Sequence, residues 1–111
     1  MSKNIIFIPN IDCGDNRANP YHLSVQSYQK WAKQHNDIEV IEWTDPIMDT
    51  NKFPIIMQRE WVFDILEHNN VNYNQVLIVD ADTIIHPNCP NFFNETNNEY
   101  SAIVNNGCYE W

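Results

Sequence analysis

Residues 75–82 read Gln-Val-Leu-Ile-Val-Asp-Ala-Asp, an apolar run that ends abruptly in two acids. A continuous apolar run of this length predicts a strand that is buried on both faces, as in a parallel sheet. Side chains two residues apart on a strand point to the same side, so we expect the carboxylates of Asp80 and Asp82 to converge. Such a pair repels itself, and a hard divalent cation or a shared proton relieves that cost. The motif therefore predicts a chemical site at the carboxyl end of this strand.

A simple turn is the alternative for the same two acids. In that interpretation both Asp side chains accept hydrogen bonds from nearby backbone N–H groups. The Ile84-Ile85 pair that follows weighs against it, because it predicts that the chain returns to apolar surroundings immediately after the acids. We favour the carboxylate pair and keep the turn as the alternative.

The rest of the chain alternates strand-like and helix-like patterns. We expect Asn19 to cap the first helix, with Pro20 at its first helical position. The second helix is expected to bury Trp61, Val62, Ile65 and Leu66. The expected elements are a strand at 4–9, a helix at 20–35, a strand at 38–43, a helix at 55–68, the strand at 75–79, a short piece at 91–93 and a strand at 101–104.

This order of elements predicts the fold class. Strands that alternate with helices are joined by right-handed crossovers and form a largely parallel sheet covered by helices on both faces. We therefore expect a three-layer α/β architecture in one domain that spans residues 1–111. Ligands of such sheets bind at the carboxyl ends of the strands, where Asp12, Asp15, Asp80 and Asp82 all fall.

Composition excludes several classes of function. The formal net charge of −9 argues against a nucleic-acid partner, because phosphate backbones require a basic stripe. No apolar run approaches the roughly 20 residues that span a bilayer. With two glycines in all, the chain has neither a Rossmann glycine motif nor a P-loop. The three scattered cysteines and the absence of a signal-peptide pattern predict a cytoplasmic protein.

Charge is distributed unevenly along the chain. All six basic residues lie within the first 59 positions, whereas residues 60–111 carry acids but no Lys or Arg. An anion such as a diphosphate that binds beside Asp80 and Asp82 would therefore depend on a metal ion for most of its local positive charge. Mg²⁺ or Mn²⁺ is expected, because both prefer oxygen ligands and keep open positions for phosphate oxygens.

The stretch from Tyr73 to Pro87 resembles the apolar-strand and DxD signature of GT-A fold glycosyltransferases, which transfer a sugar from a nucleotide-sugar donor. The resemblance implies a Rossmann-like half domain that binds a UDP- or GDP-sugar. It implies that Asp80 touches the ribose or the metal shell, and that Asp82 chelates Mn²⁺ or Mg²⁺ bridging the diphosphate. Ala81 lies between them in the donor-binding turn.

The resemblance extends to residues outside the motif. The loop from Pro9 to Asp15, which includes Asn10 and Asp12, lies at the end of the first strand, where these enzymes bind the base and ribose, although ordinary loop polarity also explains it. Arg59 is a candidate to bind a phosphate or Asp80, and its alternative is a solvated helix charge paired with a neighbouring acid. Lys52 is a weaker candidate of the same kind.

His86 is a further candidate metal ligand, and its alternative is an ordinary turn residue before Pro87. Its H-x-x-C spacing to Cys89 does not predict zinc, because a tetrahedral site needs two such halves.

The chain departs from these enzymes in length. Only residues 83–111 follow Asp82, so we expect the acceptor-binding half to be missing and to be supplied by a second protein or another copy of the chain. Two other functions remain open. One is a non-catalytic nucleotide- or metal-binding module. The other is a haloacid-dehalogenase-like phosphatase, in which Asp80 would attack phosphorus and Asp82 would act as acid and base.

Overall fold

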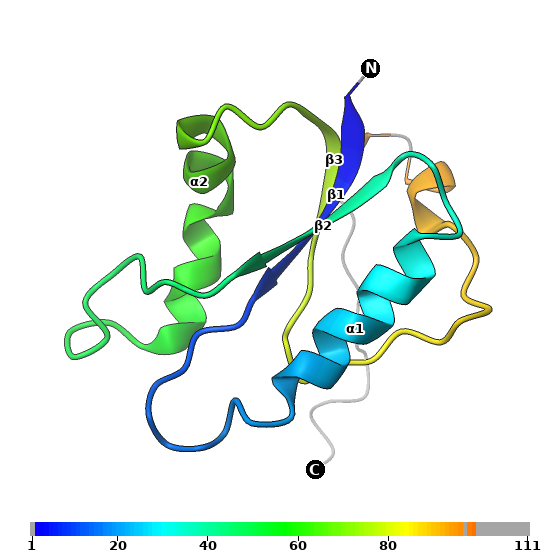
Figure 1. Cartoon of the computed structure of the whole chain (residues 1–111). Coiled ribbons are helices and arrows are strands. Elements are labelled where there is room, and N and C mark those ends of the chain that lie inside the picture. The colour runs from blue at the N-terminus through cyan, green and yellow to red at the C-terminus, as the bar shows by residue number, and fades with distance from the viewer. Residues whose placement is uncertain (1, 97, 100–111) are drawn as a thin grey trace, which may run out of the picture.

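The structure is a computed structural model that describes residues 2–96, 98 and 99. It contains a three-stranded parallel sheet in the order β2-β1-β3, which confirms the predicted α/β class (Figure 1). The expected strand at 101–104 lies outside the described residues. The elements are β1 (Lys3–Pro9), α1 (Tyr21–Ala32), β2 (Ile38–Trp43), the 3-10 helix η1 (Ile55–Trp61), α2 (Val62–His68), β3 (Tyr73–Ile78) and the 3-10 helix η2 (Phe92–Asn94).

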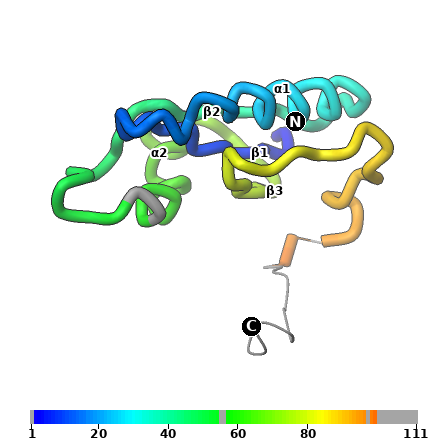
Figure 2. The backbone as a smooth tube through the Cα atoms, turned by 90° about the horizontal axis from the view of Figure 1, so that it is seen from below, coloured from blue at the N-terminus to red at the C-terminus, as the bar shows by residue number. Residues whose placement is uncertain are grey.

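The central strand β1 is buried on both faces. Ile6 and Ile8 pack against α1, whereas Ile5 and Phe7 pack against α2, and all four side chains are fully buried. This division follows from the alternation of side chains along a strand. The two helices therefore cover opposite faces of the sheet (Figure 2).

The strand order explains this three-layer arrangement. The first crossover runs from β1 to β2 on one side, and the second runs from β2 past β1 to β3 on the other side. Right-handed crossovers that step in opposite directions place their helices on opposite faces of a sheet. Within the described part of the chain, no helix has the length and hydropathy needed to cross a membrane.

The first helix is shorter than predicted. It begins at Tyr21 with Pro20 at the N-cap position, and Asn19 does not cap it. A turn precedes it instead, because the N–H of Asn19 donates to the Asn16 carbonyl. At the other end the N–H of His35 donates to Ala32, a tighter i to i−3 bond that ends the α-helix before the predicted boundary.

The predicted helix at 55–68 is divided into η1 and α2. Val62, Ile65 and Leu66 are buried as expected, but the prediction for Trp61 is wrong, since its side chain is 41% exposed. The buried Gln58 explains part of the irregular geometry. Its side chain accepts the N–H groups of Ile47 and Met48 at 2.6 and 2.9 Å, and so fixes η1 to the loop after β2.

The prediction that the third strand is buried on both faces is borne out in part, because Leu77 and Val79 pack against the α1 cluster and Val76 and Ile78 pack against the α2 cluster. β3 pairs with β1 along one edge, and Val76 to Ile78 are only half-buried. Residues 4–9 form the central strand of the sheet. The apolar run of β3 belongs to a strand that has one neighbouring strand, β1, in the described residues. Its pairing extends just beyond Ile78, because the Val79 N–H donates to the Phe7 carbonyl at 3.1 Å.

Asn4 connects three segments at the amino end of the sheet. Its buried side-chain oxygen accepts the N–H of Gln75 and the amide of Asn74, at 3.2 and 3.1 Å. Its Nδ2 donates to Asp37, just before β2. The β1–β3 register shifts at this point, so Asn4 satisfies a backbone group of β3 at the irregularity.

Asn4→Ala should therefore destabilise the fold by about 1–3 kcal/mol, because the Gln75 N–H loses its partner in a partly buried position. Urea denaturation followed by circular dichroism measures the loss. Asn72→Ala removes the same groups from an exposed position and should change the free energy of unfolding by less than about 0.5 kcal/mol. Equal stability of the two variants would contradict this role of Asn4.

Candidate functional site

The two acids lie in a turn that follows β3. Between them Ala81 is only 6% exposed and belongs to the hydrophobic cluster beneath α1, whereas Asp80 and Asp82 are exposed. The turn is closed by Thr83, whose N–H and hydroxyl both donate to the Asp80 carbonyl, at 3.2 and 2.7 Å. The buried methyl group of Ala81 thus fixes the turn while both carboxylates remain in water.

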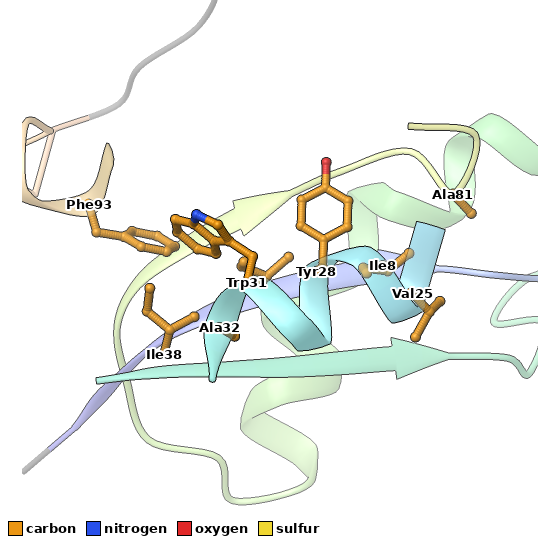
Figure 3. Close-up of a cluster of buried hydrophobic side chains, with 9 residues drawn as sticks. Ile8, Val25, Tyr28, Trp31, Ala32, Ile38, Ala81 and Phe93 are labelled. Atoms are coloured by element: carbon orange, nitrogen blue, oxygen red, sulfur yellow. The ribbon is translucent and has the colours of Figure 1, made fainter. Parts of the chain in front are cut away.

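Helix α1 holds this turn and the segment after it. Tyr28 hydrogen-bonds to the Thr83 hydroxyl at 3.0 Å, and the Trp31 indole donates to the Cys89 carbonyl at 2.7 Å. Both aromatic side chains are buried, and Figure 3 shows them beside Ala81 and Phe93 in one cluster. The position of the acidic turn is therefore set by α1 as well as by β3.

The residues after the turn bear out only half of the expectation for Ile84 and Ile85. Ile85 packs against the α1 cluster, and its N–H donates to the Ser27 hydroxyl at 3.2 Å. Ile84 is 70% exposed. Of these two residues, Ile85 therefore returns to apolar surroundings and Ile84 does not.

Neither carboxylate caps a local backbone N–H among the described residues, so the turn is not built by the two Asp side chains. The carboxylate of Asp80 instead receives a charged hydrogen bond from the Arg59 guanidinium at 3.1 Å. Of the partners considered for Arg59, the structure therefore shows Asp80, and within the described residues Arg59 makes no ion pair with a neighbouring acid of its helix. Arg59 thus joins η1 to the turn after β3.

A pocket of about 270 Å³ lies at the carboxyl ends of β1 and β3. Open α/β sheets bind their ligands at this edge. Three segments form the pocket: the loop between β1 and α1, the acidic turn after β3, and Arg59 of η1. Its lining residues are Pro9, Ile11, Cys13, Asp15, Arg17, Ala18, Tyr21, Arg59, Asp80, Ala81 and Asp82.

The predicted base-binding loop at 9–15 lines the pocket with Pro9, Ile11, Cys13 and Asp15, whereas Asn10 and Asp12 are not among the lining residues. Asn10 donates to the Glu42 carboxylate at 3.0 Å, which directs its amide toward β2. Asp12 accepts the N–H of Gly14 at 2.8 Å and stabilises the loop. Gly14 has a φ of 79°, a conformation that an L side chain rarely adopts.

The pocket does not include the two remaining candidates. His86 belongs to a separate turn, where its Nδ1 accepts the N–H of Asn88 at 3.0 Å and its carbonyl accepts the N–H of Cys89. His86 therefore lies in a turn, as in the alternative interpretation of this residue before Pro87. Lys52 lies exposed in the loop before η1, where its N–H donates to the Asp49 carbonyl.

Sequence reasoning missed Arg17 and Tyr21 as pocket residues. Arg17 lies in the loop before α1 and Tyr21 is the first residue of α1, and both line the pocket with the acidic turn. The N–H of Arg17 donates to the Asp15 carboxylate at 3.1 Å, so the loop conformation is fixed at this residue. The sequence offered one signal for Arg17 as a pocket residue, which is that a basic side chain occurs in the loop after the first strand.

The pocket has nearly balanced charges. Its lining carries three carboxylates and two guanidinium groups, which gives a formal charge of −1. Among the described residues no group of three or more His, Cys, Asp or Glu side chains is placed to hold a metal ion. Asp80 and Asp82 nevertheless offer two exposed oxygen donors, which suit Mg²⁺ or Mn²⁺ with waters or phosphate oxygens as the other ligands.

Comparison with known proteins identifies no family. No family model, no curated protein and no solved structure matches the chain. The parallel α/β fold and the geometry of its pocket are therefore the basis for assigning a function.

The Arg59–Asp80 pair is partly exposed, and we expect it to contribute little to stability. A double-mutant cycle of Arg59→Gln and Asp80→Asn should give a coupling of about 0.2–1 kcal/mol in the free energy of unfolding. The coupling should decrease between low and high salt, because both side chains are accessible to ions. A coupling that is large and insensitive to salt would mean that the pair is a structural element.

Proposed function

We propose that this chain is a Rossmann-like, GT-A-type domain that binds a nucleotide-diphosphate sugar with Mg²⁺ or Mn²⁺ and acts in sugar transfer. The observation that carries the proposal is the pocket that joins the acidic turn after β3 to the loop after β1. In this proposal Asp80 and Asp82 hold the metal ion. The residues after β1 contact the nucleotide.

The charge of the pocket supports a metal-dependent mode of binding. With a formal charge of −1, the lining does not attract an anion by itself. A divalent cation on Asp80 and Asp82 would change the local charge to +1, which complements a diphosphate. The first turn of α1 borders the pocket and adds the partial positive charge of a helix N-terminus.

The metal ion would also supply the chemistry of the reaction. When the bond between sugar and diphosphate breaks, negative charge develops on the leaving group, and a bound cation stabilises it. In this chain Ala81 and Thr83 fix the backbone of the acidic turn that carries both carboxylates, and Asp80 would exchange the Arg59 guanidinium for the ion.

The size of the pocket fits part of such a ligand. Pockets that enclose a small molecule measure roughly 300–1,000 Å³, and this one measures about 270 Å³. It suits the diphosphate and its metal ion, with the base and the sugar extending beyond it. In the proposal residues outside this pocket bind the acceptor.

UDP or GDP should bind in the presence of Mg²⁺ or Mn²⁺ and lose affinity in EDTA. Asp82→Asn keeps the shape of the side chain and removes its charge, so metal-dependent binding should fall roughly tenfold or more. Folding should be unchanged or slightly improved, because the Asp80–Asp82 repulsion is relieved. Isothermal titration calorimetry measures the binding, and urea denaturation measures the stability.

Asp45→Asn is the matched control, because Asp45 is exposed, lies after β2 and does not line the pocket. It makes the same change in charge and should leave nucleotide binding intact. Equal binding with metal and in EDTA would overturn the metal-dependent mode. Loss of folding in Asp82→Asn with binding retained would mean that the acid is structural.

A further inference from the structure

The two arginines of the pocket differ in their ion pairing. This difference indicates which guanidinium is available to the proposed ligand. The Arg59 guanidinium is already paired with Asp80 at 3.1 Å, and its side chain is 38% exposed. Arg17 lines the same pocket from the opposite loop and is exposed. Within the described part of the chain, no carboxylate lies within ion-pairing distance of the Arg17 side chain. Its donors are therefore available to a ligand.

The backbone fixes the position of Arg17 beside the pocket. The Asp15 carboxylate accepts the Arg17 N–H at 3.1 Å, and the Asn19 N–H donates to the Asn16 carbonyl at 3.3 Å. Asn16 between them has a φ of 63°, a left-handed conformation that Asn tolerates better than most residues. The Asp15 carboxylate accepts the backbone N–H of Arg17 and, within the described residues, makes no ion pair with its guanidinium.

We infer that Arg17 is the side chain that binds the phosphates in this pocket, and that Arg59 is a positioning residue for Asp80. This inference rests on the proposed function, because it names the group that receives the diphosphate. A guanidinium presents several N–H donors in a plane and pairs with two phosphate oxygens at once. Arg17 can use all of them without first breaking an ion pair, whereas Arg59 must release Asp80.

The two arginines should also affect the metal ion differently. Arg59 and a divalent ion both attract the Asp80 carboxylate, so the Arg59–Asp80 pair competes with metal binding in the free protein. Arg59→Gln should therefore bind Mn²⁺ alone as tightly as the unaltered chain or more tightly. Arg17→Gln should leave the affinity for Mn²⁺ alone nearly unchanged, because the Arg17 side chain makes no ion pair with Asp80 or Asp82 in the described structure.

Calorimetry with inorganic pyrophosphate in excess Mg²⁺ tests the assignment without a nucleotide. Arg17→Gln should weaken pyrophosphate binding by roughly tenfold or more, the effect of removing charged hydrogen bonds. Arg17→Lys should recover part of the affinity, since it keeps the charge but not the planar pair of donors. Arg59→Gln should weaken it by less than roughly threefold, consistent with an exposed pair.

Lys52→Gln is the matched control, because it makes the same change in net charge at an exposed position outside the pocket. It should leave pyrophosphate binding unchanged, and circular dichroism should confirm that all four variants fold. Pyrophosphate affinity that survives in Arg17→Gln, or that falls further in Arg59→Gln, overturns the inference.

UDP and GDP separate this inference from the proposed function. If pyrophosphate binding depends on Arg17 but neither nucleotide binds more tightly than pyrophosphate, the phosphate assignment stands and the nucleotide-sugar function fails. If the nucleotides bind with metal and Arg17→Gln has no effect, the function stands and the assignment of Arg17 fails. Absence of binding by pyrophosphate and by both nucleotides overturns both.

Discussion

Burial of β1 on both faces is the constraint on which the rest of the structure depends. Successive side chains of the strand enter opposite hydrophobic clusters, and full burial of each large apolar side chain contributes about 1.5–3 kcal/mol. Because β1 is central, β2 and β3 pair with it on either side. The carboxyl ends of β1 and β3 are thereby neighbours, and the pocket forms where they end.

The acidic turn combines buried and exposed groups in a way that avoids a large desolvation cost. Ala81 lies in the α1 cluster, and Tyr28 and Trp31 hold the segment after it through hydrogen bonds. The carboxylates of Asp80 and Asp82 stay in water, where charged groups are stable without a buried partner. The protein therefore keeps two negative charges close to one pocket while its core remains apolar.

The same arrangement relates the two proposals to each other. In the structure Arg59 partly neutralises the acidic turn through Asp80. A metal ion would take over this role and would leave a pocket with a positive local charge. Arg17 reaches that pocket from a loop on the other side, so the metal ion and the phosphate-binding side chain would act from different segments on one ligand.

The sequence by itself determined most of the elements and the fold class. The strand at 38–43 matches its prediction, the parallel α/β class is confirmed, and the acids do follow a strand at the ligand-binding edge. Local patterns carry this information because side-chain periodicity depends on the backbone of one segment. The sequence also identified Arg59 as a partner for Asp80.

Only the tertiary structure decided which strand is central and which side chains share the pocket. An apolar run such as that of β3 has the same appearance at the edge of a sheet as at its centre, because burial depends on neighbours distant in sequence. For the same reason the exposure of Trp61 and the presence of Arg17 in the pocket of Asp80 and Asp82 could not be predicted. Each is set by the packing of separate segments against β1, which local periodicity does not encode.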